Sequence, residues 1–110
     1  MSEEKTGVAA DAERLSQLYI LLQPTRQKII RTLREAKQPM YIKEIAEKIG
    51  ESHRDTSFHL ATLASNGFVE GQFREIEPPT HHSAVTGRAA KFYRLTKKVD
   101  EVTKLLAKSL

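Results

Sequence analysis

The sequence predicts a small α+β domain that is mostly helical, and three observations support this fold class. Apolar residues recur at helical spacing in several segments, short alternating stretches interrupt them, and Pro, Gly and Asn-Gly mark the boundaries. The chain has 110 residues, a length that predicts one domain. Residues 1 to 8 read as a disordered tail and residues 9 to 110 as that single domain.

The first elements are predicted to be two helices and a short strand. A helix is expected over residues 9 to 23, because apolar residues follow the i, i+3, i+4, i+7 pattern and Pro24 then ends it. A second helix is expected to begin at Pro24 or Thr25 and to run to Lys37, with Ile29, Ile30 and Leu33 on one side. The stretch 40 to 42, after Pro39, is compatible with a short strand.

Two further helices are predicted to be joined by a tight turn. The first covers residues 43 to 48, and Gly50 supplies a residue that tolerates the left-handed conformation at its end. Ser52 can cap the next helix, which runs over residues 53 to 65 and stops at Asn66-Gly67.

The rest of the chain reads as a β-hairpin and a last helix. Strands are expected over residues 68 to 76, with a bulge or a weak point at Gly71, and over residues 91 to 95, with a long loop over 78 to 87 between them. Thr96 is expected to cap a helix that runs to residue 110. The order helix, helix, short strand, helix, helix, β-hairpin, helix is the winged helix-turn-helix arrangement.

Composition excludes several classes of function. The chain has no Cys, so disulfides, thiolate metal sites and Cys nucleophiles are ruled out. Neither a signal peptide nor an apolar run of membrane-spanning length is visible, so we expect a cytoplasmic protein without membrane contact. A Gly-rich phosphate loop and a Ser/His/acid set are also missing, so we expect no enzyme and no cofactor.

The helix over residues 53 to 65 carries polar side chains on its first turn and packing residues behind them. Such a helix is suited to entering a DNA major groove. The alternative interpretation is that it is an ordinary surface helix without a binding role. For His59, a contact with the phosphate backbone and a half-buried position with a hydrogen bond to a neighbouring carbonyl remain equally open. The candidate DNA-binding residues on this helix are Ser52, His53, Arg54, Ser57, Phe58 and His59.

The hairpin is predicted to be a basic wing over about residues 69 to 95. Its candidate DNA-binding residues are Arg74, Arg88 and Lys91, which could follow the phosphate backbone. The alternative is an exposed loop with ordinary solvating charge. His81 and His82 are weaker candidates, and a dipeptide on a loop is poor support for a metal site.

Three segments give the chain a family resemblance. They read LQPTRQKIIRTLREAKQP, IKEIAEKIGESHRDTSFHLATLASNGFVE and GRAAKFYRLT. In this order and spacing the chain resembles the ArsR-like winged helix-turn-helix regulators. The resemblance implies a homodimeric transcription regulator, with the recognition positions falling on the residues named above. The Cys pair with which many members bind metal is replaced by Tyr41 and Lys43, and the last helix has no His, so no metal is expected.

The first and last helices have apolar stripes that could pair two copies of the chain or pack within one. Family resemblance favours the dimer. The predicted interface comprises Leu15, Leu18, Tyr19, Leu22, Val99, Val102, Leu105 and Leu106. Together, these observations predict a sequence-specific regulator, a repressor, that binds double-stranded DNA as a homodimer. The alternative is a winged-helix protein-interaction module in a transcription-related complex.

Overall fold

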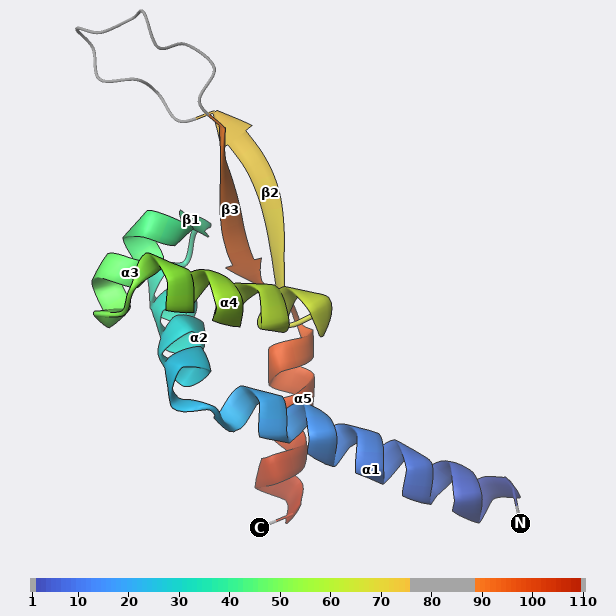
Figure 1. Ribbon diagram of the computed structural model, residues 1–110. Coiled ribbons are helices and arrows are strands. Elements are labelled where there is room, and N and C mark those ends of the chain that lie inside the picture. The colour runs from blue at the N-terminus through green and yellow to red at the C-terminus, as the bar shows by residue number, and fades with distance from the viewer. Residues whose placement is uncertain (1, 76–88, 110) are drawn as a thin grey trace, which may run out of the picture.

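The computed structural model describes residues 2–75 and 89–109, with side chains described over 11–75 and 89–104. The predicted fold class is confirmed, because five helices and a small antiparallel sheet follow one another in the expected order (Figure 1). The elements are α1 Ser2–Leu22, α2 Pro24–Ala36, β1 Met40–Tyr41, α3 Ile42–Ile49, α4 His53–Ser65, β2 Val69–Glu75, β3 Ala89–Leu95 and α5 Lys98–Ser109. The loop predicted over residues 78 to 87 lies outside the described residues.

The helix boundaries follow from local capping. At the start of α2, the side-chain oxygen of Gln23 accepts a hydrogen bond from the Arg26 backbone N–H (2.8 Å), and Pro24 occupies the first turn. At the end of α3, Gly50 adopts φ 72°, the left-handed conformation that the sequence predicted there. The chain can therefore turn within three residues from α3 into α4.

The sheet has the strand order β1-β3-β2, and all its pairs are antiparallel. Of the two alternatives predicted at Gly71, a bulge or a weak point, the bulge is wrong, because Gly71 pairs with Tyr93 in an uninterrupted register from Val69 to Glu75. A side chain at this position would collide with Lys91, whose Cε lies 2.6 Å from where a Cβ would stand. Gly71 therefore makes room for a neighbouring side chain rather than bending the strand.

The core lies between α2, α3, α4 and the base of the sheet. Its fully buried side chains include Ile29, Ile45, Leu60, Leu63 and Phe68. Burying one large apolar side chain contributes roughly 1.5–3 kcal/mol to folding. The core fixes which side of α4 faces inward, and so which side remains open.

The last helix corrects two expectations. Val99 and Val102, predicted at a dimer interface, are buried in the protomer's own core with exposed fractions of 1% and 4%, so they have almost no surface left for a partner. Thr96 does not cap α5. Its hydroxyl donates to the Gly67 carbonyl oxygen (2.6 Å), and the helix starts later, where Lys97 O accepts from Glu101 N.

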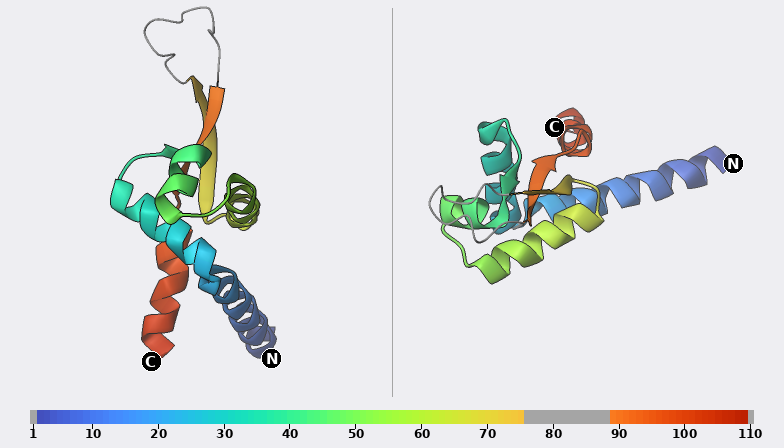
Figure 2. Two further views of the ribbon diagram at one scale, coloured as in Figure 1. Left: turned by 60° about the vertical axis from the view of Figure 1, so that its left-hand side comes forward. Right: turned by 90° about the horizontal axis from the view of Figure 1, so that it is seen from above.

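The first helix is longer than predicted. The structure continues α1 to Ser2, where the sequence predicted a disordered tail over residues 1 to 8. Glu and Ala favour helix, and one interior Gly costs only about 1 kcal/mol. Figures 1 and 2 show α1 projecting away from the domain on the side opposite the wing, and the molecule measures 67 × 26 × 23 Å.

Candidate nucleic-acid interface

The N-terminus of α4 is capped by Ser52. The Ser52 hydroxyl oxygen accepts a hydrogen bond from the Asp55 backbone N–H (3.0 Å), as the sequence predicted. The Thr56 side chain is fully buried, and its hydroxyl donates to the Ser52 carbonyl oxygen (2.8 Å). Together these bonds hold the first turn of α4 in place.

The outward side of α4 carries most of the predicted contacts. His53, Arg54, Ser57 and Phe58 are exposed, Phe58 at 62%. No carboxylate of a described residue lies within ion-pair distance of Arg54. Its guanidinium is thus available for a bidentate contact with a guanine edge or a phosphate.

His59 behaves differently from the other five candidates on α4. Its ring is partly buried, and its Nδ1 accepts a hydrogen bond from Arg26 Nε on α2 (3.2 Å). Burial, with the Arg26 charge adding to it, lowers the His59 pKa below 6.5, although the carboxylates of Asp55 and Glu51 oppose the shift. The lowered pKa favours the neutral form of His59 at pH 7.

Sequence reasoning missed the Arg26 partner altogether. Arg26 and His59 are 33 residues apart in the sequence, so no local sequence pattern could predict the hydrogen bond between them. Arg26 also donates through Nη1 to the Ile20 carbonyl oxygen (2.9 Å) at the end of α1. The carboxylate of Glu51, in the turn between α3 and α4, accepts from the Thr25 hydroxyl (3.2 Å) and so ties that turn to α2 as well.

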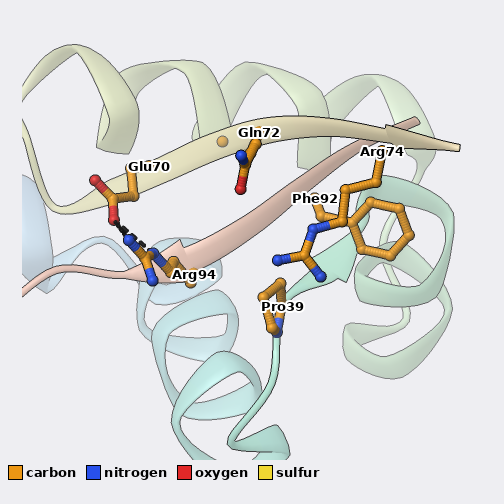
Figure 3. A pocket seen from close by; sticks show the side chains of 7 residues that line it. Pro39, Glu70, Gln72, Arg74, Phe92 and Arg94 are labelled. Carbon is orange, nitrogen blue, oxygen red and sulfur yellow. Dashed lines mark hydrogen bonds and ion pairs between the residues drawn. The ribbon is translucent and has the colours of Figure 1, made fainter. Parts of the chain in front are cut away.

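The two described wing candidates lie on opposite faces of the hairpin. Lys91 pairs with Phe73 across the strands, whereas Arg74 pairs with Ala90 at the next position, and side chains alternate between faces along a strand. Figure 3 shows α4 behind the sheet and Arg74 projecting toward the viewer, away from α4. Lys91 thus lies on the α4 side, beside the exposed ring of Phe73 (5.7 Å from Nζ to the centroid).

Arg74 borders a hollow of about 270 Å³ on the face of the hairpin that points away from α4, called the rear face below (Figure 3). Its guanidinium lies 5.8 Å from the centroid of the Phe92 ring, and Arg94 is paired with Glu70. The hollow is lined by Pro39, Glu70, Gly71, Gln72, Arg74, Phe92 and Arg94. Arg88, His81 and His82 lie outside the described residues, so the structure does not place them.

The predicted dimer residues divide into three groups. Leu15, Tyr19 and Leu22 on α1 are 66%, 79% and 54% exposed, while Leu18 packs partly against the core. Val99 and Val102 belong to the protomer core, as described above. The side chains of Leu105 and Leu106 lie outside the described residues.

Two further features of the described residues bear on function. No group of three or more His, Asp or Glu side chains in them could hold a metal ion. None of the described helices is both long and apolar enough to cross a membrane.

Comparison with known proteins gives a consistent assignment. Residues 21–72 match the profile of a helix-turn-helix domain, whereas no curated protein sequence matches the chain significantly. The structure is similar to the transcriptional repressor BigR from Xylella fastidiosa, with 26% identity over 97% of this chain and 91% of that one and a TM-score of 0.63. It is also similar to diamide-treated YodB from B. subtilis, with 25% identity over 86% and 82% of the two chains and a TM-score of 0.62.

A third similar structure supports the fold alone. It is the homodimeric winged helix-turn-helix DNA-binding domain of a possible ArsR-family regulator from Mycobacterium bovis, with 21% identity over 99% and 86% of the two chains and a TM-score of 0.60. Together with the fold, these matches show that the chain contains a winged helix-turn-helix domain, and that it is similar to ArsR-like, DNA-binding regulators of transcription.

Proposed function

We propose that this protein binds a specific site in double-stranded DNA as a homodimer and represses transcription from it. The observation that carries the proposal is the outward side of α4, whose exposed Arg54 has no ion-pair partner among the described residues. A helix capped in this way presents its first turns to the major groove, where base edges differ between all four base pairs.

The side chains of α4 suit different parts of the duplex. Arg54 can donate two hydrogen bonds to the O6 and N7 of guanine, and Phe58 can contact a thymine methyl group. The hydroxyl of Ser57 and the imidazole of His53 are suited to phosphate oxygens or to a base edge. We therefore assign base reading to Arg54 and Phe58, with the other residues holding the helix in register.

The exposed apolar face of α1 supports the homodimer. Tyr19 and Leu22 are more than half exposed, and beside them lies a hollow of about 290 Å³ bordered by Leu18, Ile30 and Val99. A second copy of α1 could cover both features. A two-fold dimer would place two recognition helices one duplex turn, about 34 Å, apart, and would favour a palindromic site. Occupancy of such a site would block access of the transcription machinery, which is the basis for proposing repression.

The test starts with duplexes selected by the full-length protein from a random pool. Replacing Arg54 with Ala should weaken binding to the selected duplex by about 1–3 kcal/mol and relax preference at one base pair, as measured by fluorescence anisotropy. Lys37→Ala is the charge-matched control, because Lys37 is an exposed cation at the end of α2. Equal affinities of the Arg54 variant and this control would contradict the assignment.

A wild-type protein that binds no duplex at low salt would overturn the proposal. That result would favour a protein-interaction module, and the exposed aromatic rings of Phe58 and Phe73 are the surface that a protein partner would contact. A reporter gene placed behind the selected duplex separates repression from activation, since repression requires lower expression when the protein is present.

A further inference from the structure

One guanidinium joins three helices next to the candidate interface. Arg26, in the first turn of α2, donates through Nη1 to the Ile20 carbonyl oxygen (2.9 Å) near the end of α1. It also donates through Nε to Nδ1 of His59 (3.2 Å) on α4. The end of the proposed dimer helix and the recognition helix are thus held by one side chain.

The hydrogen bond to His59 determines where the imidazole carries its proton. A guanidinium has only donors and does not lose its charge in proteins. The nitrogen of His59 that accepts from Arg26 must therefore be unprotonated. A neutral imidazole has one N–H, so the proton of His59 must lie on Nε2.

The Nε2 atom of His59 is not fully buried. No hydrogen-bond partner for Nε2 is found among the described residues, and no side-chain nitrogen or oxygen among them is buried without a partner. The group must therefore retain accessible surface. The ring packs edge-on against Phe58, with centroids 5.1 Å apart, so two neighbours restrict its rotation.

We propose that Arg26 is a positioning residue that holds His59 as the Nε2–H tautomer, and that this N–H donates a hydrogen bond to a phosphate oxygen of bound duplex DNA. The inference rests on the proposed function, because it assigns one backbone contact within that surface. A phosphate oxygen only accepts hydrogen bonds, so the other tautomer would turn a lone pair toward it. The charged groups facing His59 are Arg26 from α2, Asp55 on α4 and Glu51 in the turn before it.

The first test measures the tautomer in the free protein. Two-bond ¹H–¹⁵N correlation spectra at pH 8 of the full chain, labelled with ¹⁵N-histidine, should show His59 as a single Nε2–H tautomer. Replacing Arg26 with Met removes both donors, and His59 should then show signals averaged between two tautomers. A protonated Nδ1 in the wild type, or the same signals in both proteins, would overturn the role of Arg26.

The second test uses two substitutions of His59, each of which places an amide group near the position of one imidazole nitrogen. In His59→Asn the amide lies near the place of Nδ1, so the acceptor for Arg26 remains and the outward donor is lost. In His59→Gln the amide reaches the place of Nε2, so the outward donor remains. The Asn variant should bind all duplexes, selected or random, about tenfold more weakly, since a hydrogen bond to a charged group contributes about 1.5 kcal/mol or more. The Gln variant should stay within about threefold of wild type on the same scale.

A double-mutant cycle separates positioning from other effects of Arg26. Arg26→Met should weaken DNA binding in the wild-type background but much less in the His59→Asn background, because the contact it supports is already absent. The loss of one positive charge is common to both backgrounds and cancels. Equal effects in both backgrounds would overturn the proposal. Melting curves confirm that each variant is folded at the assay temperature.

The outcomes distinguish this inference from the proposed function. Wild-type binding with unchanged affinity in His59→Asn overturns the phosphate contact and leaves the proposed function standing. A wild type that binds no duplex overturns the proposed function and the phosphate contact together, while the spectra of the free protein still decide whether Arg26 fixes the ring.

Discussion

Individual residues of α4 show how far helical spacing alone predicts a site. The spacing of Leu60 and Leu63 is sufficient to place Arg54 and Ser57 outward, because a 3.6-residue period fixes opposite faces, and the structure agrees. The role of His59 was not predictable in the same way. Its position lies at the edge of the buried stripe, and its environment depends on Arg26, which folding brings in from α2.

The lowered pKa of His59 predicts a pH dependence of stability. Burial and the charge of Arg26 lower this pKa in the folded state below 6.5, so the unfolded chain binds the proton more readily. The free energy of unfolding should therefore fall as the pH drops below about 6.5, and the loss should be complete below the lowered folded pKa. Urea denaturation at pH 8 and pH 5.5 would measure it.

His59→Asn serves as the control for this pH dependence, because it removes the titrating group and retains an acceptor for Arg26. The other histidines and the carboxylates titrate in both proteins. Wild type should thus lose more stability between the two pH values than the variant. An identical loss in both would show that His59 does not contribute.

At the scale of elements, the caps at Ser52 and Gly50 were predictable, whereas the cap expected at Thr96 and the faces of the hairpin were not. Ser52 and Gly50 act on their own neighbours in sequence, and both work as the sequence indicated. The faces of the wing depend on which residues of β2 and β3 pair, and a long connection leaves that register open. Arg74 and Lys91, predicted together as one basic ribbon, consequently point to opposite sides.

The two faces of the wing predict different effects on DNA binding. Lys91 lies on the α4 side of the hairpin, so Lys91→Ala should weaken binding to all duplexes and reduce the salt slope by about 1. Arg74→Ala removes the same charge from the rear face (Figure 3) and should change the slope less. Anisotropy titrations over a range of salt concentrations would compare them. A larger effect for Arg74 would indicate that the DNA phosphate backbone lies against the face of the hairpin that points away from α4.

At the scale of the whole molecule, the chain is too extended to bury all its apolar surface. Its radius of gyration is 17.4 Å, compared with about 13 Å for a compact domain of 100 residues. The sequence predicted two stripes available for a partner, and the fold uses Val99 and Val102 internally while α1 keeps Tyr19 exposed. Periodicity identifies an apolar stripe but does not say whether its neighbour comes from the same chain.

The exposed face of α1 predicts how dimerisation can be broken. Tyr19 is 79% exposed in the protomer, so Tyr19→Glu should leave each protomer folded. In the proposed dimer it would bury an unpaired charge at two symmetric positions, at a cost of about 3 kcal/mol each. Sedimentation equilibrium should show monomer for this variant and dimer for wild type and for Tyr19→Phe. Equal masses for all three would remove α1 from the interface.

The molecular dimensions of 67 × 26 × 23 Å also determine how fast the protein diffuses in solution. A rod-shaped particle meets more friction than a sphere of equal mass, so a 12.5 kDa protomer should elute early from a sizing column. An elongated monomer can therefore elute at the position of a compact dimer. The number of chains in the particle should be determined by a method that measures molecular mass directly.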